Sequence, residues 1–160
     1  MSNKIEIKYS GLKLGNHQFY YTLDNIFFEE FQNEEILGAD IKLKVEIEKH
    51  DKMLEVSVDW DGYLVMPCDI CCEDLKVKAK GTQLVVVKIN DFIVEDDDDE
   101  IINVLSSDYK VDITNFVYDS IILSIPLRKV HGEAGEGECD KDIIEIIEKY
   151  RINNNYINNN

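Results

Sequence analysis

An alternation of apolar and polar residues that recurs between positions 40 and 90 limits the fold of this chain more than any other feature. Its clearest stretch puts four aliphatic side chains on one side of the backbone, with lysine and glutamate between them: Ile41, Leu43, Val45 and Ile47. This is the period of a β-strand with one buried face. The alternation returns in 54–60 and 76–80, while 63–66 continues as strand and 84–89 is a buried apolar run. We therefore expect an antiparallel meander of four or five strands.

Turn-forming residues divide the meander. A turn over 49–52 separates its first two strands. Asp61-Gly62 is typical of a tight hairpin turn or a bulge. Gly81 and the segment 68–74 are predicted to be the other corners.

Further strands and helices flank the meander. Alternation over 5–9 and 17–21 predicts two strands before it. Asp24 is a favourable N-cap residue for a short helix that carries Phe27, Phe28 and Phe31. Beyond the meander, 104–110 predicts a short strand or a loop.

Two more helices are predicted in the last third of the chain. Asp112 or Thr114 can cap a helix over about 113–124, which Pro126 must end. After a glycine-rich loop at 131–139, a last helix has one apolar face: Ile143, Ile146, Ile147 and Tyr150. The predicted fold class is α+β, a mainly antiparallel β meander with two or three helices.

The length of 160 residues predicts a single domain over 1–150, with an Asn-rich disordered tail at 151–160. A chain of this length buries enough surface to fold without a disulfide or a metal. The N-terminus has no apolar signal region and no segment is long and apolar enough to span a membrane, so we expect a cytoplasmic protein with reduced thiols and no membrane partner.

The net charge of −16 is unevenly distributed along the chain. Much of it comes from six consecutive carboxylates, which repel one another and predict a solvated loop: Glu95, Asp96, Asp97, Asp98, Asp99 and Glu100. Such a loop either only improves solubility or docks a basic protein or a cation. The overall sign of the charge excludes a protein whose main surface coats phosphate.

The cysteine residues predict a metal site with its two halves far apart in sequence. Cys68 and Cys71 form a C-x-x-C pair at a strand corner, which is typical of zinc knuckles, and His131 and Cys139 bound the glycine-rich loop. Together these four residues make a Cys3His set for a structural zinc ion, with Cys72 left out. Two alternatives remain open at this point: unliganded cysteines, and a dithiol redox pair.

Sequence motifs for catalysis are missing. The chain has no phosphate-binding glycine loop, no nucleophile elbow and no H-E-x-x-H sequence. We expect no enzymatic activity and no small-molecule substrate.

The segment VMPCDICCEDLKV, followed by VDITNFVYDSIILSIPLRKVH and then a cysteine, resembles the YceD family of large ribosomal RNA subunit accumulation proteins. The likeness spans roughly residues 3 to 140. Family members usually have Arg and Leu where this chain has Ile70 and Cys72, so a positive charge beside the thiols is missing here. The resemblance implies a metal-binding protein without established catalytic residues that supports the accumulation or processing of large-subunit (23S) ribosomal RNA.

The resemblance leads to a hypothesis of a non-enzymatic ribosome assembly factor. Its partners would be the large-subunit RNA precursor or basic ribosomal proteins, the latter held by the acidic loop at 95–100. The candidate RNA-binding residues are basic side chains on strand faces and near the cysteines: Lys76, Lys78, Lys80, Arg128 and Lys129, with Lys42 and Lys44 on a second strand. The alternatives are a metal-stabilised protein-interaction module without RNA contact and, for the lysine rows, simple solvated faces.

Overall fold

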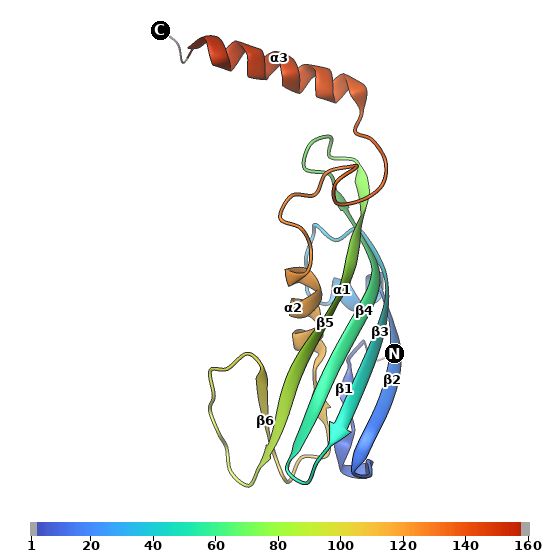
Figure 1. Ribbon diagram of the computed structural model, residues 1–160, viewed down its shortest axis with the longest axis vertical. Coiled ribbons are helices and arrows are strands. Elements are labelled where there is room, and N and C mark those ends of the chain that lie inside the picture. The colour runs from blue at the N-terminus through green and yellow to red at the C-terminus, as the bar shows by residue number, and fades with distance from the viewer. Residues whose placement is uncertain (1–2, 158–160) are drawn as a thin grey trace.

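The computed structural model describes residues 3–157 and contains a five-stranded sheet (Figure 1). The strands are β2 (Gly15–Asp24), β3 (Gly38–Lys49), β4 (Met53–Pro67), β5 (Asp74–Asn90) and β6 (Ile101–Leu105), in that spatial order. Neighbouring strands are antiparallel except β5 and β6, which are parallel. The α+β class and the mainly antiparallel meander are confirmed.

The prediction that Asp61-Gly62 forms a turn or bulge is wrong. Residues 53–67 form the single strand β4, and Gly62 pairs with Ile41 on one side and Ala79 on the other without a break in register. A Cβ atom on Gly62 would lie 2.1 Å from the carbonyl oxygen of Asp40. Glycine is therefore needed here because two strand backbones approach closely, and not because the chain reverses.

The predicted corner at Gly81 is also wrong, because β5 continues through it from Asp74 to Asn90. Gly81 pairs with Trp60, and a Cβ atom at this position would lie 2.5 Å from the indole Cζ2 atom. The Trp60 ring fills the space above the glycine. As a result, the segment 40–90 contains three long strands where we expected four or five.

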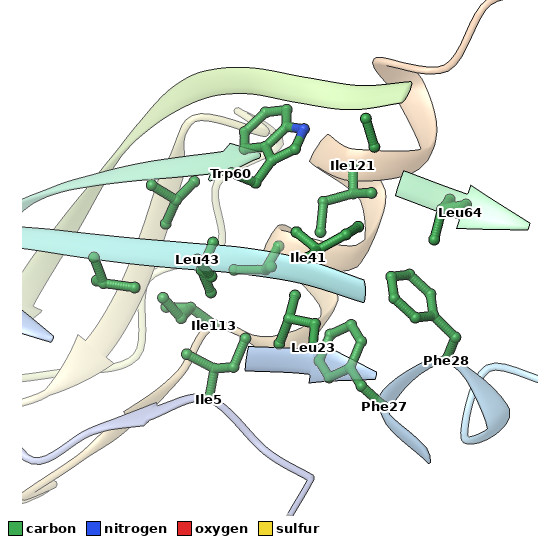
Figure 2. Close-up of a cluster of buried hydrophobic side chains, with 14 of the residues drawn as sticks. Ile5, Leu23, Phe27, Phe28, Ile41, Leu43, Trp60, Leu64, Ile113 and Ile121 are labelled. Carbon is green, nitrogen blue, oxygen red and sulfur yellow. The ribbon is translucent and has the colours of Figure 1, made fainter. Parts of the chain in front are cut away.

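One face of the sheet is covered by the remaining elements. These are β1 (Glu6–Ile7), a 3₁₀ turn (Tyr9–Gly11), α1 (Asn25–Glu29), β7 (Val111–Asp112) and α2 (Thr114–Leu123). Figure 2 shows the resulting core: sheet residues such as Leu23 and Ile41 meet Phe27 and Phe28 of α1 and Ile121 of α2. All five side chains are buried. The opposite face carries the polar members of the alternation and is open to solvent.

Side-chain hydrogen bonds fix the starts of α1 and α2. The Asp24 carboxylate accepts the Ile26 N–H (3.0 Å), which confirms the predicted N-cap. The N-cap residue of α2 is Ile113, so the prediction of Asp112 or Thr114 as its cap is wrong. Asp112 nevertheless accepts the Thr114 N–H (2.9 Å), and the Thr114 hydroxyl accepts the Ile5 N–H (2.8 Å). The start of α2 is thereby tied to the short β1–β7 sheet, which pairs Glu6 with Asp112.

The last helix, α3 (Lys141–Ile157), projects beyond the end of the sheet in Figure 1. Of its predicted apolar face, Ile143 packs against the core, while Ile146 and Tyr150 are 52% and 68% exposed. Residues 151–157 of the predicted tail belong to this helix, and 158–160 lie outside the described residues. None of the helices within 3–157 has the length and apolar character needed to cross a membrane.

Candidate metal centre

The turn between β4 and β5 meets the glycine-rich loop at one end of the sheet. The ligand atoms of Cys68, Cys71, His131 and Cys139 all lie within 4.8 Å of one another. The Cys68 and Cys139 Sγ atoms are 3.7 Å apart, and His131 Nδ1 lies 3.4 Å from Cys71 Sγ and 3.7 Å from Cys139 Sγ. The four residues predicted as ligands are thus brought together from two segments about sixty positions apart.

The first half of the cluster is a tight turn closed by backbone hydrogen bonds. The Cys68 N–H donates to the Glu73 carbonyl (2.8 Å), and the Cys72 N–H donates to the Cys68 carbonyl (3.0 Å). Cys72 has a φ of 62°, in the left-handed region, and its side chain is exposed. The two cluster thiols of this turn are buried, so the chain reversal separates Cys72 from Cys68 and Cys71.

The second half of the cluster is anchored to the first by reciprocal hydrogen bonds. The Asp69 N–H donates to the Lys129 carbonyl (2.7 Å), and the Asp69 carboxylate accepts the Lys129 N–H (2.6 Å). The Lys129 ammonium also lies 3.8 Å from Asp69. Further along, the Lys78 N–H donates to the Ala134 carbonyl (3.3 Å). These bonds hold the loop against the edge of β5.

Gly135 allows the loop to approach that edge. A Cβ atom on Gly135 would lie 2.1 Å from the Lys76 carbonyl oxygen, so a larger residue would push the loop away. Gly132 and Gly137 have φ values of 84° and 100°, which favour glycine. The three glycines that the sequence places between His131 and Cys139 therefore shape the turn that carries both side chains inward.

His131 has its ring fixed by a backbone group. Its Nε2 atom lies 3.2 Å from the Asp74 carbonyl oxygen, which can only accept a hydrogen bond. This contact favours the tautomer with the proton on Nε2 and leaves the Nδ1 lone pair facing Cys71 and Cys139. A backbone carbonyl that accepts the other ring N–H is a usual orienting partner of a metal-binding histidine.

The thiols of the cluster have opposite pKa shifts. Burial alone raises the pKa of Cys68, but hydrogen bonds from the backbone amides of Cys71, Ile70 and His131 bring it down to about 6. Burial raises the pKa of Cys139, and the neighbouring Cys68 and Cys71 thiols raise it further, to about 11. A thiolate at Cys68 thus disfavours a second thiolate next to it unless a cation neutralises both.

Three of the six separations between the ligand atoms agree with those around a zinc ion. With Zn–S bonds of about 2.3 Å and a Zn–N bond of about 2.0 Å, tetrahedral coordination puts sulfur atoms about 3.8 Å apart and sulfur about 3.5 Å from nitrogen. The separations of 3.7, 3.4 and 3.7 Å match these values. Four protein ligands leave no open position for a substrate, so a zinc ion here would be structural.

Comparison with known proteins identifies the family. The family model described as "Large ribosomal RNA subunit accumulation protein YceD" matches residues 56–156, more than half of the chain. The chain belongs to the YceD family. The match includes all four cluster residues, as the sequence resemblance led us to expect, but it begins within β4 and not near residue 3. No curated protein and no solved structure matches the chain.

The predicted basic residues of this YceD-family chain fall into two groups. Lys76, Lys78 and Lys80 lie on the open face of the sheet, as alternation along β5 requires. Lys80 is paired with Asp61 (3.1 Å), whereas the Lys76 ammonium lies 4.6 Å above the centre of the Tyr63 ring. Arg128 and Lys129, by contrast, precede His131 and are paired with Glu133 and Asp69.

The acidic residues at 95–100 lie in the exposed connection between β5 and β6. Two short turns shape it, in which Asp96 accepts the Asp98 N–H (3.2 Å) and Asp98 accepts the Glu100 N–H (2.9 Å). The loop predicted from charge repulsion is therefore present in this YceD-family chain.

Sequence reasoning missed a hollow of about 820 Å³ on the open face of the sheet. It is lined by Tyr20, which is 71% exposed, and by side chains from β3, β4 and β5 that include Lys42, Lys44 and Lys80. The outward positions of each strand were readable from the alternation. Which of these positions lie side by side depends on the register of the strands. That register could not be predicted, because Gly62 and Gly81 were interpreted as turns.

Proposed function

We propose that this chain is a non-enzymatic ribosome assembly factor that supports the accumulation or processing of 23S ribosomal RNA in the cytoplasm. The observation that carries the proposal is the family match, whose description attributes large ribosomal RNA subunit accumulation to its members. That description names no enzymatic reaction, in keeping with the missing catalytic motifs.

In this proposal the metal centre has a structural role. A zinc ion would be held by Cys68, Cys71, His131 and Cys139. When bound, it would cross-link the two chain segments that carry these residues. The chain's own residues prepare the site: Asp69 docks the loop, and the Asp74 carbonyl orients His131. This end of the sheet is where β5 begins, directly before its lysine row.

RNA contact is assigned to the open face of the sheet. Lys76 and Lys78 lie on this face without an ion pair among the described residues, and the Tyr63 ring lies beside Lys76. Tyr20 offers an exposed ring in the hollow that Lys42, Lys44 and Lys80 line. Lysines attract phosphate, and exposed aromatic rings stack with unpaired bases. A net charge of −16 confines such contact to a local patch. The paired residues Lys80, Arg128 and Lys129 would contribute less, because nearby carboxylates offset their charge.

Complementation of a depleted strain tests this function. Depletion should lower the ratio of large-subunit to small-subunit ribosomal RNA, and the unaltered gene should restore it. The double variant Lys76→Glu, Lys78→Glu should restore it poorly, because it reverses the charge of the unpaired lysines. Lys52→Glu with Lys88→Glu is the matched control, since both are exposed lysines at the other end of the sheet and the change in charge is the same. An unchanged RNA ratio on depletion would contradict the proposed function.

The second candidate is a metal-stabilised protein-interaction module without RNA contact, with the acidic loop 95–100 holding a basic protein. The exposure of that loop and its six adjacent carboxylates favour it. Purification of the complex from cells with and without ribonuclease treatment separates the two candidates. Ribosomal components that are lost on treatment indicate RNA contact, and components that are retained indicate protein contact.

A further inference from the structure

The outer edge of β5 is left unpaired over a short stretch. On one side of this stretch the Lys78 N–H donates to the Ala134 carbonyl, and on the other the Val86 N–H donates to the Glu100 carbonyl. Because alternate residues of a strand point their N–H groups to the same edge, those of Lys80, Thr82 and Leu84 face outward too. Within residues 3–157 none of these three N–H groups has a hydrogen-bond partner. The open stretch is about 17 Å long, at about 3.4 Å per residue.

A groove of about 950 Å³ lies between this edge and α2. Figure 1 shows α2 beside β5, with β6 paired to only one end of the strand. The wall formed by α2 is mixed: its apolar residues are Phe116, Ile122 and Leu123, the last of which is 85% exposed, and polar residues lie between them. The Trp60 ring and Gly81 lie at the strand side of the groove. An unpaired strand edge next to apolar surface is the arrangement to which an added strand binds.

The rim of the groove is acidic. None of the residues that line the groove is lysine or arginine. Four of them carry a carboxylate: Asp99, Glu100, Asp112 and Asp119. Asp112 is partly engaged, since it lies 3.9 Å from the Lys4 ammonium and accepts the Thr114 N–H. Asp99 and Glu100 end the acidic run and bring its charge to the groove. Nucleic acid would be repelled here, and a cationic occupant would be attracted.

We propose that this groove binds an extended segment of a basic protein, which adds as a strand to the open edge of β5. Backbone hydrogen bonds would form with Lys80, Thr82 and Leu84. Alternate side chains of the segment would then contact the apolar residues of α2, and lysine or arginine residues would face the carboxylates. This inference rests on the proposed function, from which the kind of partner is taken: a basic ribosomal or assembly protein. It adds where that partner binds and how it is recognised.

The test uses a fluorescent ten-residue peptide of alternating lysine and valine, with fluorescence anisotropy as the readout on the full chain. A peptide of alternating glutamate and valine should bind at least about tenfold more weakly, because the rim would repel it. Only alternate N–H groups of an added strand face the edge, so N-methylation of either the valines or the lysines should weaken binding about tenfold, and N-methylation of the other set should weaken it less. Hydrogen exchange should slow at Lys80, Thr82 and Leu84 when the unmodified peptide is added.

Variants separate strand addition from general attraction to an acidic protein. Thr82→Pro removes one outward N–H at an edge position and should weaken binding about tenfold, whereas Thr82→Ala keeps that group and should bind normally. Asp99→Asn with Glu100→Gln should weaken binding, while Asp96→Asn with Asp97→Asn removes the same charge outside the groove and should change affinity by less than about twofold.

Three results would overturn the inference: equal losses for the two pairs of acidic variants, unchanged binding of both N-methylated peptides, or a dimer of this chain whose formation depends on the Thr82 N–H. The RNA measurements stand apart from these results. An unchanged RNA ratio with specific peptide binding would refute the assembly role alone, and a changed ratio without specific binding would refute the groove alone.

Discussion

At the scale of single residues, the Cys3His cluster is the part of the molecule that the sequence predicted most fully. The cysteine spacing indicated one pair of ligands, and the histidine and cysteine that bound the glycine-rich loop indicated the other. The structure adds what spacing alone does not contain: the Asp69 contacts with Lys129 that bring the halves together, and the Asp74 carbonyl that orients His131. Both partners are distant in sequence from the groups they serve, so no local pattern could have revealed them.

Metal analysis of single variants tests the cluster. Protein purified without chelators should contain one zinc per chain, and Cys68→Ser or Cys139→Ser should reduce this to well below one, because a serine hydroxyl is a much weaker zinc ligand than a thiolate. The control is Cys72→Ser, which removes an exposed thiol of the same turn and should retain the metal. Loss of zinc from the Cys72 variant, or its absence from the unaltered chain, would contradict the assignment.

At the scale of elements, the main error of the sequence prediction was to take two glycines as chain reversals. Alternation identified the strands of the meander, and the residues of β3 were assigned to the correct faces. Gly62 and Gly81 carry the same sequence signal as turn glycines, yet each relieves a close contact inside a long strand. The contacts involve a carbonyl of β3 and the ring of Trp60, and they exist only once the strands are paired. Strand length therefore could not be predicted from local preference.

The stability of Gly81→Ala tests this account of β5. The added Cβ would lie 2.5 Å from the Trp60 ring, which is held by a hydrogen bond from its Nε1–H to the Ser124 hydroxyl (3.2 Å). We expect a loss of about 1–3 kcal/mol in the free energy of unfolding, as for other overpacked cores. Gly11→Ala is the control, since a Cβ there has nothing within 4 Å and no loss is expected. Denaturant unfolding followed by circular dichroism measures both; equal effects would refute the role of the ring.

At the scale of the whole molecule, the body and α3 are nearly independent. The sheet, its covering elements and the metal centre form one core, whereas α3 touches that core through Ile143 and leaves Ile146 and Tyr150 exposed. The amphipathic pattern predicted the helix correctly, but an apolar face in a sequence does not say what covers it. The charge pattern likewise predicted the acidic loop. It could not predict the groove beside the loop, because that groove depends on where α2 packs.

Truncation of the chain tests this independence. A chain that ends at Ile144 keeps Ile143 and Cys139, so it should retain zinc and its unfolding midpoint should fall by less than about 4 °C. A chain that ends at Glu138 lacks Cys139 as well and should lose the metal. Thermal unfolding with metal analysis on both chains provides the measurement. A large drop in midpoint for the longer chain would show that the rest of α3 is part of the core.

The contact between Cys68 and Cys139 has a topological consequence. A metal held there closes a ring of chain between two residues 71 positions apart, and this ring contains all of β5, β6 and α2. In the chain-entropy view, a cross-link of that span raises the free energy of the unfolded state by about 4 kcal/mol, provided that it persists there. The bound metal would thus constrain the chain as a disulfide does, without the need for an oxidant. A chelator, and not a reductant, would open the ring.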